Sequence, residues 1–204
     1  RLGSVEREKI AQWLDKRING RLPLPYISGR SWFCGLEFSV DERVLIPRSP
    51  MAELIQRGFS PWLGERTVNS ILDLCCGSAC IAIACQYAFP DADVAAADIS
   101  ADALSVAADN CARHGLSERL TLVQSDGLAA LSGQQFDLIV CNPPYVDADD
   151  MASLPSEYQH EPSLALASGA DGLTFVRQLL GTAAAYLTPG GLLFCEVGNS
   201  YVHI

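Results

Sequence analysis

The sequence predicts an α/β fold, a doubly wound parallel sheet that follows a small region of one helix and a β-hairpin. Two observations carry this prediction. From residue 70 onward, short apolar runs alternate with longer helical patterns, as in chains that cover a parallel sheet on both faces. Hydrophobic residues make up 49% of the 204 residues, enough apolar material for one packed core. We therefore expect an N-terminal region over residues 1–57 and a sheet domain over residues 58–204.

The N-terminal region begins with VEREKIAQWLDKRI, in which apolar residues recur at helical spacing, and Gly20 follows as a stop signal. RLPLPYISG is expected to be irregular because of its prolines. SWFCGLEFSVDERVLI predicts a hairpin that turns near residues 41–43. Pro47 and Pro50 close this region and lead to a short helix in MAELIQRGF. We expect the region to face the substrate.

The sequence of the sheet domain predicts five strands and three helices. Ser100 is the expected N-cap of the second helix, Gly115 lies past its end, and Pro189-Gly190 is expected to stop the last helix. Because ligands of such sheets bind at the carboxyl ends of the strands, the residues that follow each strand are candidates for a site. The expected strands are ILDLC, VAAAD, LTLVQ, FDLIVC and LLFCEVG, and the expected helices are CIAIACQYAF, SADALSVAADNCARHG and FVRQLLGTAAAYL.

The net charge of −10 is unevenly distributed. Residues 1–57 hold ten Lys and Arg against seven Asp and Glu, whereas residues 58–204 hold four against seventeen. An acidic sheet domain disfavours a general nucleic-acid-binding surface. It suits a cationic cofactor or a basic partner, or it serves only solubility.

The eight cysteines predict no metal site and no disulfide framework. Six of them lie in apolar runs, no CxxC pair occurs, and the three histidines are far apart in the sequence. We expect reduced thiols that pack as small core residues, and therefore a cytoplasmic protein. No segment has the roughly 18 consecutive apolar residues that a membrane span needs.

The first strand of the sheet domain runs into the turn DLCCGSAC, whose small residues let a ligand approach the backbone. A dinucleotide fingerprint would need glycine at Cys75, Gly77 and Cys80, and only Gly77 fits. A pyrophosphate is therefore poorly held, whereas S-adenosylmethionine has no phosphate and carries a positive sulfonium. A tight turn with no ligand is the alternative.

Acidic residues end the next two strands. Asp98 is placed to bind the two hydroxyls of a ribose, and Asp126 in QSDG can accept from the exocyclic amine of an adenine. Taken alone, Asp98 could serve only the dipole of the following helix, and Asp126 could be a turn residue before Gly127. Several such strand ends in order indicate a ligand site more specifically than any one of them does.

The fourth strand ends in Asn142-Pro143-Pro144-Tyr145. The Asn142 side-chain oxygen and the Pro143 carbonyl can accept hydrogen bonds from the two N–H groups of an amide, which orients that poor nucleophile for attack. Proline stiffens the segment and removes competing donors, and the Tyr145 ring can lie against the flat target group. The tetrad therefore predicts N-methylation, the alternative being a proline-rich stop after a strand.

Four stretches of the sequence, in their order and spacing, resemble the Rossmann-like class I methyltransferases that modify planar nitrogens. They are DLCCGSACIAIA, AAADIS, QSDG and CNPPYV. LIPRSPMAELI and YQHEPSLALASGADGL resemble the glutamine methyltransferases of the translation apparatus. RSP favours the type that acts on large-subunit ribosomal protein uL3 over the type that acts on peptide-chain release factors. The likeness covers nearly the whole chain. It implies methyl transfer from S-adenosyl-L-methionine to a glutamine side-chain amide, with S-adenosyl-L-homocysteine as product.

The resemblance also assigns residues by position. It implies that Asn142 to Tyr145 contact the target glutamine, and that Arg48 and Glu53 form the wall of its pocket. Cys75 and Ala79 stand where many family members have glycine, and Ala79 would be harmful only at a positive φ. The residues implied at the cofactor are Asp73, Cys75, Gly77, Asp98, Ile99, Asp126, Gly127 and Asn142.

The ends of the sequence and the NPPY tetrad leave further expectations. The family continues past the fifth strand with a helix and an antiparallel hairpin, so we expect missing C-terminal strands or a neighbour beside that strand. Adenine-specific DNA methyltransferases share the tetrad, which therefore indicates the reaction and not the substrate. DNA methylation, and cofactor binding without catalysis, remain as alternatives.

Overall fold

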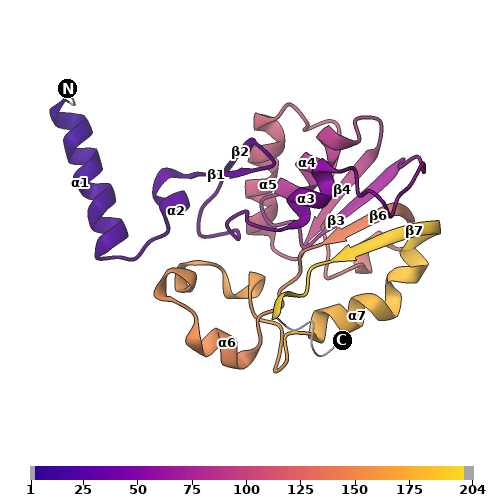
Figure 1. Cartoon of the computed structure of the whole chain (residues 1–204). Helices are drawn as coiled ribbons and strands as arrows, with labels where there is room; N and C mark the ends of the chain where they lie inside the picture. Colours follow the sequence, from indigo (N-terminus) through magenta and orange to yellow (C-terminus); the bar gives the residue numbers. More distant parts are fainter. Residues whose placement is uncertain (1–2, 200–204) are drawn as a thin grey trace.

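A computed structural model describes residues 3–199 and contains a five-stranded, wholly parallel sheet in the order β5-β4-β3-β6-β7 (Figure 1). From β3, the chain adds β4 and β5 on one side and β6 and β7 on the other, so the topology switches between β3 and β6. The predicted fold class is confirmed. The strands are β3 (Ser70–Leu74), β4 (Asp93–Asp98), β5 (Leu120–Gln124), β6 (Phe136–Cys141) and β7 (Leu187–Cys195).

Helices cover both faces of the sheet, and successive strand side chains belong to two different buried clusters. On β6, for example, Val140 packs into one cluster and Cys141 into the other. Ser100 caps α5 as predicted, because its hydroxyl accepts from the Ala103 N–H. One face carries α3 (Met51–Gln56), α4 (Cys80–Ala88) and α5 (Ala101–Arg113), and the other carries α7 (Thr174–Thr182).

The N-terminal region contains the predicted helix α1 (Ser4–Ile18) and two features that differ from expectation. RLPLPYISG is not irregular throughout, because Leu24–Ser28 form the short helix α2. Its proline lies in the first turn, where a helix tolerates the missing N–H. The hairpin of β1 (Arg30–Phe33) and β2 (Leu36–Ser39) turns at Cys34-Gly35, not at residues 41–43.

Positive φ angles explain the position of that turn, since Cys34 and Gly35 have φ values of 50° and 78°. Two-residue hairpin turns of this kind match the twist of the strands. The segment that was expected to turn forms a separate loop after β2, in which the Val44 N–H donates to the Asp41 carbonyl at 3.1 Å.

Helix α1 stands apart from the sheet domain (Figure 1) and contains no buried residue. Most of its apolar side chains are exposed, with Val5 at 76% and Ile18 at 65%, whereas Trp13 is half-buried. The apolar spacing therefore predicted the helix correctly, although most of that face is exposed in the described part of the chain.

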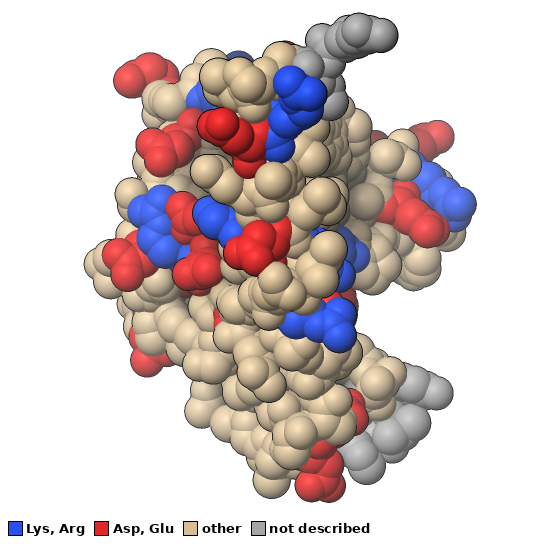
Figure 2. Space-filling view, turned by 90° about the vertical axis from the view of Figure 1, so that its left-hand side faces the viewer, with Lys and Arg blue, Asp and Glu red and all other residues tan. Residues whose placement is uncertain are grey.

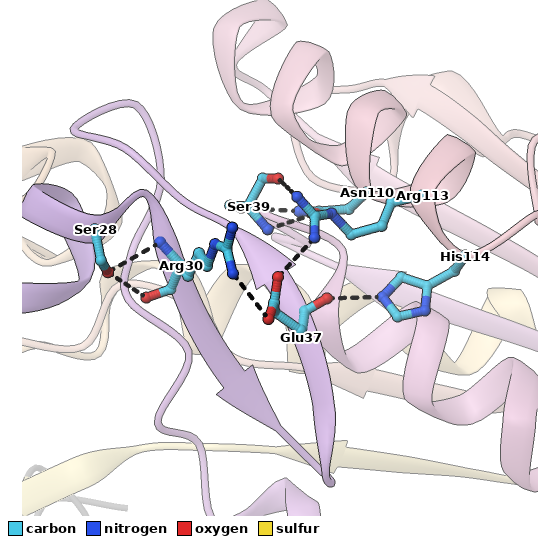
Figure 3. Close-up of polar contacts among 7 residues, drawn as sticks. All are labelled: Ser28, Arg30, Glu37, Ser39, Asn110, Arg113 and His114. Carbon is cyan, nitrogen blue, oxygen red and sulfur yellow. Dashed lines mark hydrogen bonds and ion pairs between the residues drawn. The ribbon is translucent and has the colours of Figure 1, made fainter.

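Polar contacts fasten the hairpin to α5 (Figure 3). The Asn110 side chain accepts from the Ser39 N–H at 2.7 Å and donates to the Ser39 carbonyl at 3.0 Å. Arg113 forms an ion pair with Glu37 at 2.7 Å, and the His114 ring contacts the Glu37 carbonyl at 3.0 Å. Asn110 is fully buried, so its bonds join the hairpin to the core.

Strand β7 begins earlier than predicted. The residues 183–186 form a 3₁₀ turn, and Pro189-Gly190 lie within β7 and do not stop the preceding helix. The register shifts there, since Phe136 pairs with Leu187 and Leu138 with Leu192. Proline is tolerated because β7 is an edge strand, bonded only to β6 among the strands described. The short elements of the domain are η1 (Ala129–Leu131), α6 (Ala148–Ser153), η2 (Ser156–His160), η3 (Ser163–Ala165) and η4 (Ala183–Tyr186).

The surface seen in Figure 2 carries basic and acidic side chains interspersed, without a large field of one sign. Exposed ion pairs such as Arg43–Asp41 and Arg177–Asp171 also place opposite charges side by side on the described surface. The eight cysteines are free thiols. Among the helices of residues 3–199, none has both the length and the apolar character that crossing a bilayer requires.

Candidate active site

Two adjoining cavities open at the carboxyl ends of the strands. The first has a volume of about 250 Å³ and is lined by the turns that follow β3, β4, β5 and β6. The second has a volume of about 420 Å³ and is lined by the segment after β6, α6 and the loops around residues 154–166. Four of the residues described line both cavities, namely Leu45, Arg48, Asn142 and Ala165. The wall between the cavities therefore includes the side chain that the sequence places at the reacting group.

The turn after β3 holds an unusual backbone. Cys75, Gly77 and Ala79 have φ angles of 61°, 53° and 60°. The condition under which Ala79 was expected to be harmful is therefore met. Because the left-handed region disfavours residues with a Cβ, Cys75 and Ala79 each store about 1–2 kcal/mol there. These conformations turn the chain tightly between β3 and α4 at the edge of the first cavity.

The Asp98 carboxylate fixes this turn from the next strand. Its Oδ2 accepts from the Gly77 N–H at 2.8 Å, and its Oδ1 accepts from the Ser100 N–H at 2.9 Å. Each oxygen keeps a second lone pair for a ligand. Asp126 and Gly127 line the same cavity from the end of β5.

Asn142 follows β6 and supplies an unpaired acceptor. Its Oδ1 is buried and finds no hydrogen-bond partner within the described part of the chain. Asn142 lines both cavities, and an unpaired buried acceptor costs about 1–3 kcal/mol, so a ligand N–H that donated to this oxygen would relieve that cost. Pro144 lines the first cavity, whereas Pro143 and Tyr145 line the second.

Tyr145 is fixed by a carboxylate behind the cavity wall. Its hydroxyl donates to Glu196 Oε1 at 2.6 Å, and the Ser49 hydroxyl donates to Glu196 Oε2 at 2.6 Å. Burial, and then the bond to Glu196, raise the pKa of Tyr145 well above its usual range. The phenol therefore remains a hydrogen-bond donor at neutral pH.

Arg48 lines both cavities and is held by a buried acid. Its guanidinium forms an ion pair with Glu161 at 2.6 Å, and the Glu161 side chain is 3% exposed. The other Glu161 oxygen accepts from the Ile46 N–H at 3.1 Å. Arg48 also lies 4.9 Å from the centre of the Tyr158 ring, a cation–π distance.

The structure brings most of the predicted site residues together and places two elsewhere. Cys75, Gly77, Asp98, Ile99, Asp126, Gly127, Asn142 and Pro144 line the first cavity, and Arg48, Asn142, Pro143 and Tyr145 line the second. Glu53 is exposed on α3 and lines neither cavity. Asp73 is fully buried beneath the turn, where its Oδ2 accepts from the Ala82 N–H at 2.9 Å. Burial raises the pKa of Asp73 to about 8, which suits a framework residue more than a ligand contact.

The sequence reasoning assigned no role to Glu161, Glu196 or Tyr158. In the structure Glu196 directly follows β7, but the expected strand LLFCEVG extends past it to Gly198, so the rule that polar residues at strand ends face a ligand does not single it out. Glu161 and Tyr158 lie in the irregular segment YQHEPSLALASGADGL, in which no periodicity shows the direction of a side chain.

A protein-family model, the methyltransferase small domain, matches residues 59–157. A ribosomal protein uL3 glutamine methyltransferase of Francisella tularensis is 50% identical over 201 residues, which cover 98% of this chain and 64% of the relative. One of Bordetella pertussis is 48% identical over 199 residues, covering 97% and 67%. The chain thus spans about two thirds of the length of these relatives.

Solved structures with low sequence identity share the fold. The catalytic domain of hMettl16, solved in complex with an RNA hairpin of the MAT2A 3′UTR, has a TM-score of 0.65 at 16% identity, covering 98% of this chain and 70% of its own. A SAM-dependent methyltransferase from Agrobacterium tumefaciens has a TM-score of 0.53 at 17% identity, covering 81% and 51%. The likeness to the two curated relatives is far stronger and extends along nearly the whole chain. The chain belongs to the family of the ribosomal protein uL3 glutamine methyltransferases.

Proposed function

We propose that the protein transfers a methyl group from S-adenosyl-L-methionine to the side-chain amide nitrogen of a glutamine in ribosomal protein uL3. The observation that carries this proposal is the Asn142 oxygen, a buried acceptor without a partner among residues 3–199, in the wall shared by the two cavities. An acceptor between two cavities is placed to hold an N–H group of one ligand beside the other ligand.

The residues of the first cavity fit S-adenosylmethionine. When bound, this cofactor supplies an electrophilic methyl group on a cationic sulfonium. Asp98 has free lone pairs for the hydroxyls of a ribose, and Asp126 for the amine of an adenine. The two acids favour a cationic ligand, and the single glycine among the three fingerprint positions disfavours a pyrophosphate.

The residues of the second cavity fit a flat carboxamide. Asn142 and the Pro143 carbonyl accept its two N–H groups, and Tyr145 lies along its face. These contacts orient the nitrogen lone pair toward the first cavity, where catalysis follows from positioning and preorganised dipoles. After the transfer the methylated nitrogen releases one proton to solvent, so no charged base is needed beforehand.

Ribosomal protein uL3 is proposed as the substrate because the two curated relatives are named for it. Ribosomal proteins are commonly basic, which suits the acidic sheet domain. The proposal also implies a cytoplasmic enzyme, in agreement with eight free thiols.

The test is a methylation assay with three acceptors. The protein is incubated with methyl-labelled S-adenosylmethionine and, separately, unmethylated uL3, an unmethylated release factor, or duplex DNA that contains adenine. We expect label in uL3, located on one glutamine by mass spectrometry of its peptides.

Each other outcome corrects a different part of the proposal. Label in the release factor alone would retain glutamine methylation and replace the substrate. Label in DNA alone would overturn protein methylation. Calorimetric binding of the cofactor without transfer to any acceptor would indicate a binding module.

A further inference from the structure

One carboxylate joins three segments behind the second cavity. Glu196 follows β7, Tyr145 follows β6, and Ser49 precedes α3. Both Glu196 oxygens accept a hydroxyl hydrogen bond at 2.6 Å, one from Tyr145 and one from Ser49. Hydrogen bonds to a carboxylate are about twice as strong as those between neutral groups, so this junction is firm.

The carboxylate is fixed in turn by the sheet and by α3. The Glu196 N–H donates to the Cys141 carbonyl at 2.9 Å, directly before Asn142 in the chain. Ser49 is 7% exposed, and its hydroxyl oxygen accepts from the Met51 N–H at 3.1 Å. The place of the Tyr145 hydroxyl is therefore set by elements outside the tetrad.

The Tyr145 ring is also confined by Gly198. A Cβ at Gly198 would lie 2.5 Å from Tyr145 Cδ2 and 2.6 Å from Cε2, closer than real Cβ contacts. Gly198 has a φ of 52°, a conformation that glycine adopts without strain. The ring is thus held at its hydroxyl by Glu196 and along its edge by the Gly198 backbone.

We propose that Glu196 is a positioning residue, which holds the Tyr145 ring at the distance from Asn142 that the target carboxamide requires. This inference rests on the proposed glutamine methylation. Glu196 lines neither cavity, so it acts through Tyr145 and not by touching a ligand. Misplacing a contact by about 1 Å can lower a rate by about 100-fold, which makes such support important.

The test compares Glu196→Ala with Glu196→Gln in steady-state kinetics on uL3. Glutamine keeps an oxygen that can accept from Tyr145, so we expect Glu196→Gln to stay within about 3-fold of the wild type in kcat. Glu196→Ala loses that acceptor and should lower kcat by about 10- to 100-fold. Calorimetry should show an unchanged affinity for S-adenosylmethionine in both variants. Glu118→Ala, an exposed glutamate after α5, is the matched control.

A second measurement follows the ring without any turnover. In NMR spectra of ring-labelled tyrosine, the Tyr145 signal, assigned through Tyr145→Phe, should shift in Glu196→Ala and stay in place in Glu118→Ala. A double-mutant cycle should show that Glu196→Ala has little further effect on kcat once Tyr145 is Phe.

Three results would overturn the inference while leaving the proposed function intact. They are normal turnover of Glu196→Ala, an unmoved Tyr145 signal, or equal losses in Glu196→Gln and Glu196→Ala. The last result would assign Glu196 a role as proton acceptor. A wild-type protein that methylates none of the three acceptors would instead refute the proposed function, and the inference with it.

Discussion

The two cavities are built in different ways. The first is made by main-chain turns at the ends of neighbouring strands, and two of its turn residues, Cys75 and Ala79, hold positive φ angles. The second is lined by the segment after β6, by α6 and by residues 154–166, and it includes polar side chains such as Arg48, Tyr145 and Tyr158. The first therefore depends on backbone conformation and the second on hydrogen-bonded side chains.

Under the proposed function, this difference separates the binding of the cofactor from the binding of the substrate. A cofactor of fixed shape is suited by turns whose positions follow from strand register. A substrate residue on a protein is suited by side chains anchored from outside, as Glu161 anchors Arg48 and Glu196 anchors Tyr145. Among the described residues that line both cavities, Asn142 alone directly follows a strand of the sheet.

The largest expected effect comes from breaking the shared wall at Asn142. Asn142→Ala removes the unpaired acceptor and should lower kcat for glutamine methylation by about 100-fold, as the loss of one preorganised dipole does in other sites. Cofactor affinity, measured by calorimetry, should change far less, since the proposed contacts of the cofactor with Asp98 and Asp126 remain.

The matched control is Asn69→Ala, which removes an exposed asparagine before β3, at the opposite end of the sheet. It should leave kcat within about 2-fold of the wild type. A near-normal kcat in Asn142→Ala would contradict the shared wall, and the two cavities would then have to work without it.

The first cavity could be predicted from the sequence much more fully than the second. Asp98, Asp126 and Asn142 end parallel strands, and such ends must converge at one edge of a sheet. The positive φ of Ala79 could not be predicted, because alanine rarely adopts it. Glu161 and Tyr158 could not be predicted, because their segment has no regular spacing of apolar residues that would indicate where a side chain points.

The N-terminal region shows the same limit. The helix α1 followed from its spacing, whereas the hairpin turn was placed near residues 41–43 by their polar character. The actual turn at Cys34-Gly35 depends on backbone angles that polarity does not report. Several residues of the second cavity, such as Leu154 and Pro155, also come from irregular segments.

The next prediction concerns Asp73, which is buried beneath the turn of the first cavity, and the pH dependence of the free energy of unfolding. Burial raises the pKa of Asp73 from its ordinary value of 3.8 to about 8. At pH values between these two, the folded protein therefore keeps a proton on Asp73 that the unfolded chain has released. The free energy of unfolding should therefore fall as pH rises from about 4 to 8, by up to about 1.4 kcal/mol per pH unit.

Asp73→Asn removes this titration and keeps an oxygen for the Ala82 N–H. Denaturant unfolding at several pH values should show a flatter profile for Asp73→Asn than for the wild type, with the greatest gain near pH 8. Asp91→Asn, an exposed aspartate before β4, should follow the wild type. Parallel profiles for Asp73→Asn and the wild type would show that Asp73 does not hold its proton.

The smallest expected effect is a change in the free energy of unfolding at Ala79, and it tests whether the turn beside the first cavity is strained. Ala79→Gly relieves about 1–2 kcal/mol of left-handed strain. It also loses a buried methyl, worth about 0.8 kcal/mol, and loosens the unfolded chain by about 0.4–1 kcal/mol. These terms nearly cancel, so the free energy of unfolding should change by less than about 1 kcal/mol.

Ala84→Gly supplies the contrast, because Ala84 is also buried but lies within α4 at an ordinary helical φ. It suffers both losses without any relief of strain, so it should destabilise the protein by at least about 1 kcal/mol more than Ala79→Gly in denaturant unfolding. Equal losses at the two positions would mean that Ala79 is not strained. If the contrast holds while S-adenosylmethionine affinity is unchanged in Ala79→Gly, the cofactor site does not depend on the methyl group that alanine adds at residue 79.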